Sequence, residues 1–395
     1  MNLNLLIAPS GFKEALDPDR VAECIARGVR RADPRIQIDS IPMVDGGEGT
    51  ARILAEQTRG QLLRVTVTGP VNQPVEARLA LLGSAWTGTA VVEMAQAAGL
   101  RLVPHHQRNP LLTTTYGVGE LIRAAMDAGA ERVLVGCGDS GTNDAGAGAA
   151  QALGVRLLDR DGHELGPGGG ELLRLARIDL SGRDRRLAQV AIEVACNWSI
   201  PLVKASHSFG RQKGADNAQI RILESALENF AKVVQHDLGL DVRTMPGGGA
   251  SGGLGAGLHA LLSATLRPRF DVISRYLDLE EKLSRADLVI TAEGRLDAQT
   301  CPGKVPAEVA RRATRLGIPV IVLAGSVGED ARGCLSGGID AYSSVLTIPC
   351  SLPEAIAQTA SMLEEGAEQL WRFVRVGIRL RNQIKGSAVV NELIK

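Results

Sequence analysis

The feature that most constrains this 395-residue chain is a repeated order of segments: a short run of aliphatic residues, a glycine-rich or acidic loop, then a longer stretch with helical spacing. At the N-terminal end, residues 3–8 predict a strand and residues 18–31 a helix. The order returns near the other end, with strands predicted over 287–291 and 318–323 around a helix over 306–316. These units predict a layered α/β fold in which both chain ends share one parallel sheet.

The middle of the chain follows a different pattern. Strands are predicted over 62–68, 75–82 and 90–93, and the loops between them are too short for crossover helices. This spacing predicts an antiparallel or mixed sheet, and therefore an inserted second domain with boundaries near residues 60 and 270. The residues after Gly377 form a basic, weakly amphipathic tail, for which we expect a solvated or packed terminal helix.

Composition excludes several classes of protein. Lys plus Arg equals Asp plus Glu at 44 each, so nothing favours binding to nucleic acid or to an anionic membrane. The six cysteines form no Cys-x-x-Cys pair and the histidines lack zinc-ligand spacing, which predicts free thiols in a reducing cytosol. The N-terminus resembles no signal peptide, and no apolar run reaches the length of a membrane span. We therefore expect a cytoplasmic protein.

The most suggestive loop is 136–148, Gly-Cys-Gly-Asp-Ser-Gly-Thr-Asn-Asp-Ala-Gly-Ala-Gly, which follows a predicted strand and precedes a short helix. Glycines and small hydroxyls at a helix start expose N–H groups that can bind phosphate. Two other interpretations stay open: the glycines serve only a tight turn and close packing, or Gly136, Gly138 and Gly141, with Asp159, form a dinucleotide fingerprint. The fingerprint is the weaker, because it needs a long helix at the third glycine.

A second glycine cluster, 246–257, enters a predicted helix. So many glycines destabilise a helix start by about 1 kcal/mol each relative to alanine, so the cluster needs a compensating interaction. A bound nucleotide phosphate and tight helix packing are equally good explanations at this point. Neither cluster contains the Gly-Lys-Ser or Gly-Lys-Thr sequence of a Walker loop. The Gly-Lys pair at 303–304 does not complete one either, because Val305 follows it rather than Ser or Thr.

Charged residues lie in several of these loops. Lys13 is a cation among small residues, and Asp45 and Glu48 stand between glycines, where they can take a proton or hold a cation. Any one such loop is most often a solvated turn. Several of them at strand ends in one neutral chain favour a small anionic substrate and a nucleotide. Further charges of this kind are Lys213, Glu293, Arg295 and Asp297.

At these loops the sequence resembles the glycerate kinase family of the bacterial type, also called type II. The resemblance covers about residues 3–375, in order. The matching stretches are 7–14 (Ile-Ala-Pro-Ser-Gly-Phe-Lys-Glu), 44–50, 93–95 with 98–100, 108–114, 116–122, 142–144 (Thr-Asn-Asp), 212–215 (Gln-Lys-Gly-Ala), 246–257, 293–297 (Glu-Gly-Arg-Leu-Asp) with 299–300 (Gln-Thr), and 303–304.

The resemblance implies a two-domain α/β enzyme that uses ATP and Mg²⁺ to phosphorylate D-glycerate, usually to 2-phosphoglycerate, in organic acid catabolism. It implies a Rossmann-like domain built from 1–60 plus 271–378, an inserted α/β domain over 61–270, and a tail over 379–395. Its expected partners are D-glycerate and ATP, without nucleic acid or membrane, and a homodimer is left open.

The resemblance also suggests roles for individual residues. Catalytic roles are expected for Lys13, Asp45, Asp144 and Asn197. Magnesium is expected at Glu293 and Asp297. Substrate or phosphate binding is expected at Ser10, Gly46, Gly47, Glu48, Gly138, Ser140, Gly141, Thr142, Asn143, Lys213, Gly248, Gly249, Ser251, Arg295 and Lys304.

The chain departs from the family pattern at three places. Ser10-Gly11 stands where many members have Asp-Ser, and Asp139 puts a negative charge into the proposed phosphate loop. Asn197 stands where members have an aspartate, and the loop over 199–209 is shorter and lacks their glycines. An asparagine cannot accept a proton, which leaves two alternatives open: a kinase for another small hydroxy acid, or a weakened nucleotide- or glycerate-binding sensor.

Overall fold

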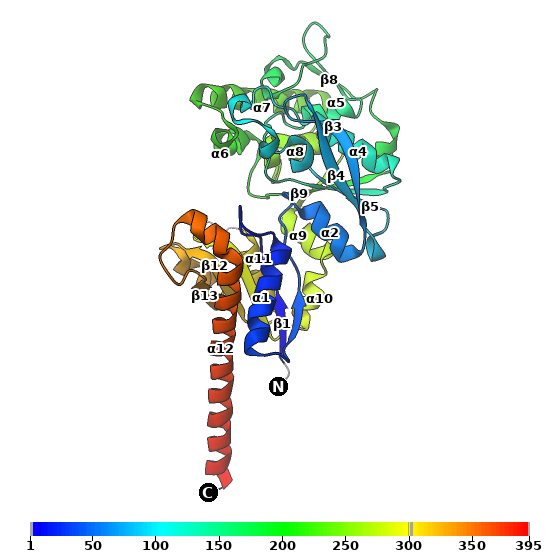
Figure 1. Ribbon diagram of the computed structural model, residues 1–395. Helices are drawn as coiled ribbons and strands as arrows, with labels where there is room; N and C mark the ends of the chain where they lie inside the picture. Colours follow the sequence, from blue (N-terminus) through cyan, green and yellow to red (C-terminus); the bar gives the residue numbers. More distant parts are fainter. Residues whose placement is uncertain (1–2, 299, 301–302, 394–395) are drawn as a thin grey trace. The chain divides into compact units, whose positions relative to one another are not determined.

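The computed structural model describes residues 3–298, 300 and 303–393, and the chain divides into two compact units (Figure 1). Unit 1 comprises 1–44 and 278–395, and unit 2 comprises 45–277. The sequence placed the first boundary near residue 60. The structure assigns 45–60 to unit 2 because α2 (Thr50–Thr58) packs on the sheet of that unit.

Unit 1 contains a five-stranded sheet in which every pairing is parallel, as the sequence predicted. The strand order is β13-β12-β11-β1-β2, so the two chain ends meet where Leu5 of β1 pairs with Leu288 of β11. The central strands β1 and β11 are mostly buried, which is typical of a parallel sheet covered on both faces. The strands are β1 (Asn4–Ile7), β2 (Gln37–Ser40), β11 (Leu288–Leu296), β12 (Val320–Val327) and β13 (Ala341–Ser344).

Helices α1 (Pro18–Ala32) and α12 (Leu352–Leu393) share one hydrophobic core with β1 and β11. The two helices cross closely, since a Cβ on Gly28 would lie 2.1 Å from the carbonyl oxygen of Glu364. Helix α12 continues past residue 379, so the predicted tail extends this helix (Figure 1). The remaining helices of unit 1 are α10 (Leu279–Ser284) and α11 (Val305–Arg315).

Unit 2 contains the mixed sheet that the sequence predicted, in the order β10-β9-β6-β5-β4-β3. Strands β3, β4 and β5 pair antiparallel, whereas β5, β6, β9 and β10 pair parallel. The carboxyl ends of β5, β6 and β9 therefore meet at one edge, where ligands bind in α/β folds. The strands are β3 (Gln61–Thr68), β4 (Pro74–Leu81), β5 (Thr89–Glu93), β6 (Arg132–Gly136), β9 (Ala191–Cys196) and β10 (Thr265–Pro268), with a separate β7 (Arg156–Leu158) and β8 (Arg177–Asp179) ribbon.

The larger helices of unit 2 are α4 (Tyr116–Asp127), α7 (Asn217–Leu238), α8 (Ala250–Leu262) and α9 (Arg269–Tyr276), with short helices α3 (Ala95–Ala98), α5 (Ala147–Ala152) and α6 (Ala205–Phe209). Within the described part of the chain, no helix has the length and apolarity needed to cross a membrane. Five of the cysteines are free thiols, as predicted, and Cys301 lies outside the described residues.

Candidate active site

Two glycine loops of unit 2, 45–49 and 136–139, touch backbone to backbone. A Cβ on Gly136 would lie 2.5 Å from the carbonyl oxygen of Gly46, and one on Gly138 would lie 2.5 Å from the Cα of Gly47. Any side chain at Gly136 or Gly138 would push the loops apart. The structure thus brings together two of the loops that the sequence singled out, and it gives these glycines a packing role.

Carboxylates fix the main chain of the 45–49 loop. Glu93, at the carboxyl end of β5, accepts hydrogen bonds from the N–H groups of Gly49 (3.3 Å) and Ala51 (2.5 Å). Asp139 accepts from the N–H of Glu48 at 3.2 Å, and Asp45 from that of Gly47 at 3.3 Å. These amides are therefore engaged within the protein, and the loop presents the exposed side chains of Asp45 and Glu48 instead.

Glu93 is a site residue that received no role from the sequence, although it lies in one of the matching stretches. Its side chain is 1% exposed. Burial raises its pKa to about 7, against the opposing hydrogen bonds from Ala51, Gln96 and Gly49. An acidic residue at the end of an otherwise apolar strand was the signal that could have identified it.

The two acidic side chains of the 45–49 loop pair with arginines. Arg269, at the start of α9, reaches Asp45 at 3.0 Å, and Arg101 pairs with Glu48. The sequence suggested neither arginine. The guanidinium of Arg269 is more buried than its partner, with 18% of the side chain exposed against 51% for Asp45. Asp45 is thus oriented by a neighbouring cation while one side stays open to solvent.

Asp144 is buried at the centre of the 138–148 loop. Its carboxylate accepts from the N–H (2.8 Å) and hydroxyl (2.9 Å) of Thr115 and from the N–H groups of Gly146 (3.1 Å) and Gly148 (3.3 Å). Burial raises the pKa of Asp144, and these hydrogen bonds oppose the shift. At 1% exposure the carboxylate faces main chain rather than solvent, which is the geometry of a loop anchor.

Lys213 is also buried, at 1% exposure, and its ammonium donates to the carbonyl oxygen of Thr142 at 2.7 Å. The sequence grouped it with the ligand-binding residues, but the structure directs it into the protein. Asn143 donates to the hydroxyl of Ser206 at 3.1 Å. The Thr142 hydroxyl and the side-chain amide oxygen of Asn143 are among the buried polar atoms of the described residues that have no hydrogen-bond partner.

The 246–257 glycine run packs against the Asp144 loop. A Cβ on Gly252 would lie 2.2 Å from the carbonyl oxygen of Thr142, and one on Gly257 would lie 1.8 Å from that of Ala145. Three consecutive residues, 251–253, adopt left-handed φ values inside α8, including Ser251 at φ 52°. Tight packing thus accounts for these glycines. Gly248 and Gly249, also expected to bind ligand, are buried in the same segment.

The dinucleotide interpretation of Gly136, Gly138 and Gly141 is wrong. No helix begins at Gly141; the next helix, α5, starts at Ala147 and has six residues. Gly141 is instead held in the loop, where its N–H donates to the carbonyl oxygen of Ala98 at 2.8 Å. The fingerprint requires a long helix whose N-terminus faces the pyrophosphate, and this segment lacks one.

Asn197 follows β9 at the same edge of the sheet and is partly buried. Its side-chain oxygen accepts from the hydroxyl of Ser199 at 3.0 Å, so it closes a local turn. Asp139, the second unusual residue, directs its carboxylate to the 45–49 loop, and its backbone is left-handed at φ 51°. A non-glycine residue in that region is strained, which is common at functional sites.

Unit 1 carries a separate group of charges in the last residues of β11 and the loop that follows it. The Lys304 ammonium lies 3.5 Å from a carboxylate oxygen of Glu293 and 3.5 Å from one of Asp297. The Thr300 hydroxyl donates to Glu293 at 2.6 Å, and Arg295 pairs with Asp297 at 3.1 Å. Burial raises the pKa of Glu293, while Thr300 and Lys304 oppose the shift. The two acids proposed for magnesium therefore converge on one positive charge.

The first loop of unit 1 lies beside this strand. Ser10 is tied to β11, because its N–H and its hydroxyl both lie 2.9 Å from the carbonyl oxygen of Ala292. The next residues form a turn closed between Phe12 and Leu16, and it leaves Lys13 exposed. Ser10 thus acts as a structural tie, while Lys13 remains the accessible cation of the loop.

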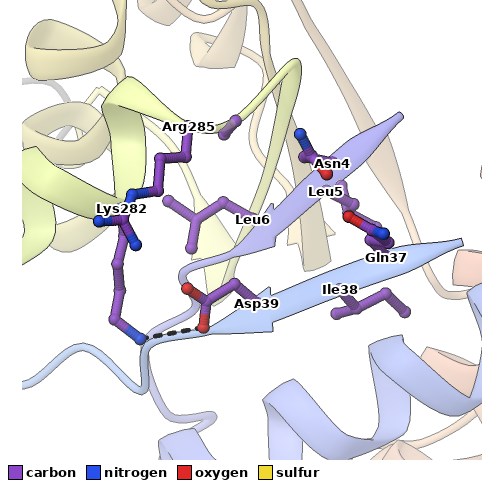
Figure 2. Close-up of a pocket in the computed structure, with 9 residues that line it drawn as sticks. Asn4, Leu5, Leu6, Gln37, Ile38, Asp39, Lys282 and Arg285 are labelled. Atoms are coloured by element: carbon purple, nitrogen blue, oxygen red, sulfur yellow. Dashed lines mark hydrogen bonds and ion pairs between the residues drawn. The ribbon is translucent and has the colours of Figure 1, made fainter. Parts of the chain in front are cut away.

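A pocket of about 450 Å³ in unit 1 lies elsewhere (Figure 2). It is lined by residues 4–6 of β1, residues 37–39 of β2, and residues in and just after α10, and Lys282 pairs across it with Asp39 at 2.9 Å. Ligands in α/β sheets usually bind beyond the carboxyl ends of the strands. None of the predicted site residues lines this pocket.

Glycine loops with paired charges at the strand ends of two α/β units are typical of enzymes that transfer phosphoryl groups to small molecules. Comparison with known proteins agrees, since the glycerate kinase family matches residues 5–375. The chain is 46% identical over 369 residues to a glycerate kinase of Halalkalibacterium halodurans, covering 93% of this chain and 97% of that protein. It is 42% identical over 380 residues to the glycerate 2-kinase of Escherichia coli K12, covering 95% and 99%.

A solved structure extends the comparison to the fold. The crystal structure of a Salmonella typhimurium LT2 protein provisionally named glycerate kinase 2 matches with a TM-score of 0.83 at 43% identity. The match covers 96% of this chain and 100% of the other. The chain belongs to the glycerate kinase family, and it is a kinase.

Proposed function

We propose that this protein transfers the γ-phosphoryl group of ATP to D-glycerate and forms 2-phosphoglycerate, as part of organic acid catabolism in the cytoplasm. The observation that carries the proposal is the near full-length similarity to proteins named glycerate kinase and glycerate 2-kinase. Phosphoryl transfer depends mainly on positioning and charge neutralisation, and the loops supply fixed charges at the strand ends for both.

Within the 138–148 loop, the phosphate-binding part can be narrowed. The N–H groups of Gly141, Ala145, Gly146 and Gly148 donate inside the protein. We therefore keep the assignment of phosphate binding at Gly138 and Ser140, beside the left-handed Asp139, and withdraw it from the glycines further along. Asp144 acts in this proposal as the anchor that gives the loop its shape.

Asp45 is the better candidate for accepting the hydroxyl proton of glycerate. A general base has to reach the substrate, and the Asp45 side chain is half exposed while that of Asp144 is buried. Arg269 orients the Asp45 carboxylate through their ion pair at 3.0 Å. Lys13 is assigned to the glycerate carboxylate or the transferred phosphoryl group, because it is the accessible cation of its loop.

Magnesium fits the pair Glu293 and Asp297. Both are oxygen donors of the type that Mg²⁺ prefers, and both already face one cation, the Lys304 ammonium. When bound, the metal would neutralise charge on the nucleotide phosphates. Thr300 orients Glu293 by donating a hydrogen bond to its carboxylate, and Lys304 would supply a positive charge for a phosphate oxygen.

The test is to incubate the pure protein with ATP, Mg²⁺ and D-glycerate, to follow ADP, and to identify the product by phosphorus NMR. We expect ADP formation that depends on D-glycerate, and a 2-phosphoglycerate signal. The altered segment at 197–209, where Asn197 closes a turn with Ser199, favours one alternative: a different small hydroxy acid as substrate. A higher kcat/KM for another acid would establish that alternative, whereas tight binding without turnover would support a sensor.

A further inference from the structure

The buried lysine Lys213 has no role in the chemistry proposed above, although burying an ammonium costs several kcal/mol unless it is well paired. Its Nζ is 2.7 Å from the carbonyl oxygen of Thr142, and the charge that acts on it among the described residues is that of Asp144. Burial lowers its pKa to about 7, and Asp144 opposes the shift. A methionine could fill the same volume without this cost, so the charge calls for an explanation.

The backbone around Lys213 directs its side chain into the protein. Gly214 ends the short turn Arg211–Lys213 with φ 97°, and a Cβ there would lie 2.3 Å from the carbonyl oxygen of Arg108. A few residues earlier, the Ser206 hydroxyl accepts from Asn143. The 206–214 segment therefore contacts two consecutive residues of the Asp144 loop, Thr142 through Lys213 and Asn143 through Ser206.

Asp144 is fixed separately, by Thr115 immediately before α4. Its carboxylate also accepts from the N–H groups of Gly146 and Gly148, which lead into α5. The loop is thus held between the Thr115 anchor and the Lys213 ammonium. Removing Lys213 would leave a buried carboxylate without a compensating cation and would release the Thr142 carbonyl.

We propose that Lys213 is a positioning residue of the kinase: its buried ammonium fixes the Thr142 carbonyl and balances Asp144, and so holds the 138–146 loop in its phosphate-binding shape without touching nucleotide or glycerate. The proposal rests on the proposed function, because phosphate binding is the role assigned to Gly138 and Ser140 of that loop. It replaces the direct ligand contact that the sequence suggested for Lys213.

The experiment compares the full-length protein with Lys213→Met and with Lys213→Gln, which keeps a donor but removes the charge. Lys232→Met changes an exposed lysine of α7 and is the matched control. Hydrogen exchange of peptides over 138–148 is measured by mass spectrometry, with the β3–β4 hairpin as internal reference. The kcat and the KM for ATP and for D-glycerate are measured on the same samples.

We expect exchange over 138–148 to rise at least fivefold in both Lys213 variants while the hairpin stays unchanged. We expect kcat/KM to fall at least tenfold, mainly through kcat, and Lys232→Met to behave as the parent. Three results would each overturn the proposal. They are unchanged hydrogen exchange over 138–148, a kcat/KM for Lys213→Gln within twofold of the parent, and an equal rise of exchange throughout unit 2. If Lys213→Met fails to fold, Lys213→Gln alone decides. A parent protein without turnover would refute the proposed kinase reaction, but the exchange comparison would still test the anchoring of the loop.

Discussion

Replacing Glu93 by glutamine removes one ionisable group from the junction between β5 and the 45–49 loop. The carboxylate accepts from two main-chain N–H groups, of Gly49 and Ala51, and from the side-chain amide of Gln96 at 3.3 Å. Glutamine has nearly the same shape and keeps one acceptor oxygen, but it cannot titrate. The substitution therefore separates the contribution of the ionisation from that of the packing.

The structure gives the sign and size of the effect. Burial raises the pKa of Glu93 from 4.5 to about 7, so the folded state binds this proton more tightly than the unfolded state. The stabilisation is complete below pH 4.5 and is lost as the pH rises to 7. A shift of this size corresponds to about 3 kcal/mol. The nearby charge of Glu48 acts in the same direction, whereas the Ala51, Gln96 and Gly49 donors oppose it.

The assay is urea unfolding of the parent and of Glu93→Gln at pH 4.5, 6 and 7.5, followed by circular dichroism. We expect the parent's advantage in unfolding free energy to shrink by about 3 kcal/mol between pH 4.5 and 7.5, because contributions of all other groups cancel in the difference. Glu131→Gln, at an exposed glutamate of unit 2, is the matched control for the same change of side chain. A difference for Glu93→Gln that is independent of pH would refute the argument.

Three further predictions concern the site. Lys13→Ala should lower kcat/KM at least tenfold, about 1.4 kcal/mol of transition-state stabilisation, with an unchanged melting curve; an unchanged rate would make its loop structural. Glu293→Gln should raise the Mg²⁺ concentration for half-maximal activity at least tenfold in a metal titration, and an unaltered titration would remove Glu293 from the metal site. Gly257→Ala should destabilise unit 2 by about 3 kcal/mol or more, because the Cβ would lie 1.8 Å from the Ala145 carbonyl oxygen. The control Gly166→Ala, whose Cβ would lie no closer than 3.6 Å to another atom, should melt like the parent.

The layered fold was predictable because its information is local. Aliphatic runs such as that of β11 predict buried parallel strands, and the missing crossover segments between β3, β4 and β5 predict their antiparallel pairing. The position of the first domain boundary was harder to predict from the sequence. Helix α2 follows a loop that resembles the other strand-end loops, and only its packing on the sheet of unit 2 shows to which unit it belongs.

The residues of the site were predictable by type and much less by role. Pattern and resemblance selected Asp144 as a candidate base and Lys213 as a candidate ligand-binding residue. The sequence did not show that both side chains are buried. In the structure, each makes hydrogen bonds within the protein instead of facing solvent. Arg269 could not have been found in this way. Its partner Asp45 lies 224 residues away along the chain, and nothing local distinguishes it from other surface arginines.

The two glycine clusters show why spacing alone could not decide between packing and phosphate binding. Each cluster removes side chains where the other approaches, as Gly252 does beneath Thr142 and Gly257 beneath Ala145. The reason for the glycines therefore becomes visible only when two segments more than 100 residues apart are considered together. Each segment alone resembles a nucleotide-binding loop. The glycines that serve this packing are not candidates for phosphate binding. The candidates left in the loop are Gly138 and Ser140, on either side of Asp139, whose backbone is left-handed. Strain persists only where the surroundings enforce it, and here the 45–49 loop does so through the bond from Glu48 to Asp139. The shape of the proposed phosphate loop thus depends on a loop that contacts it from a distant part of the sequence.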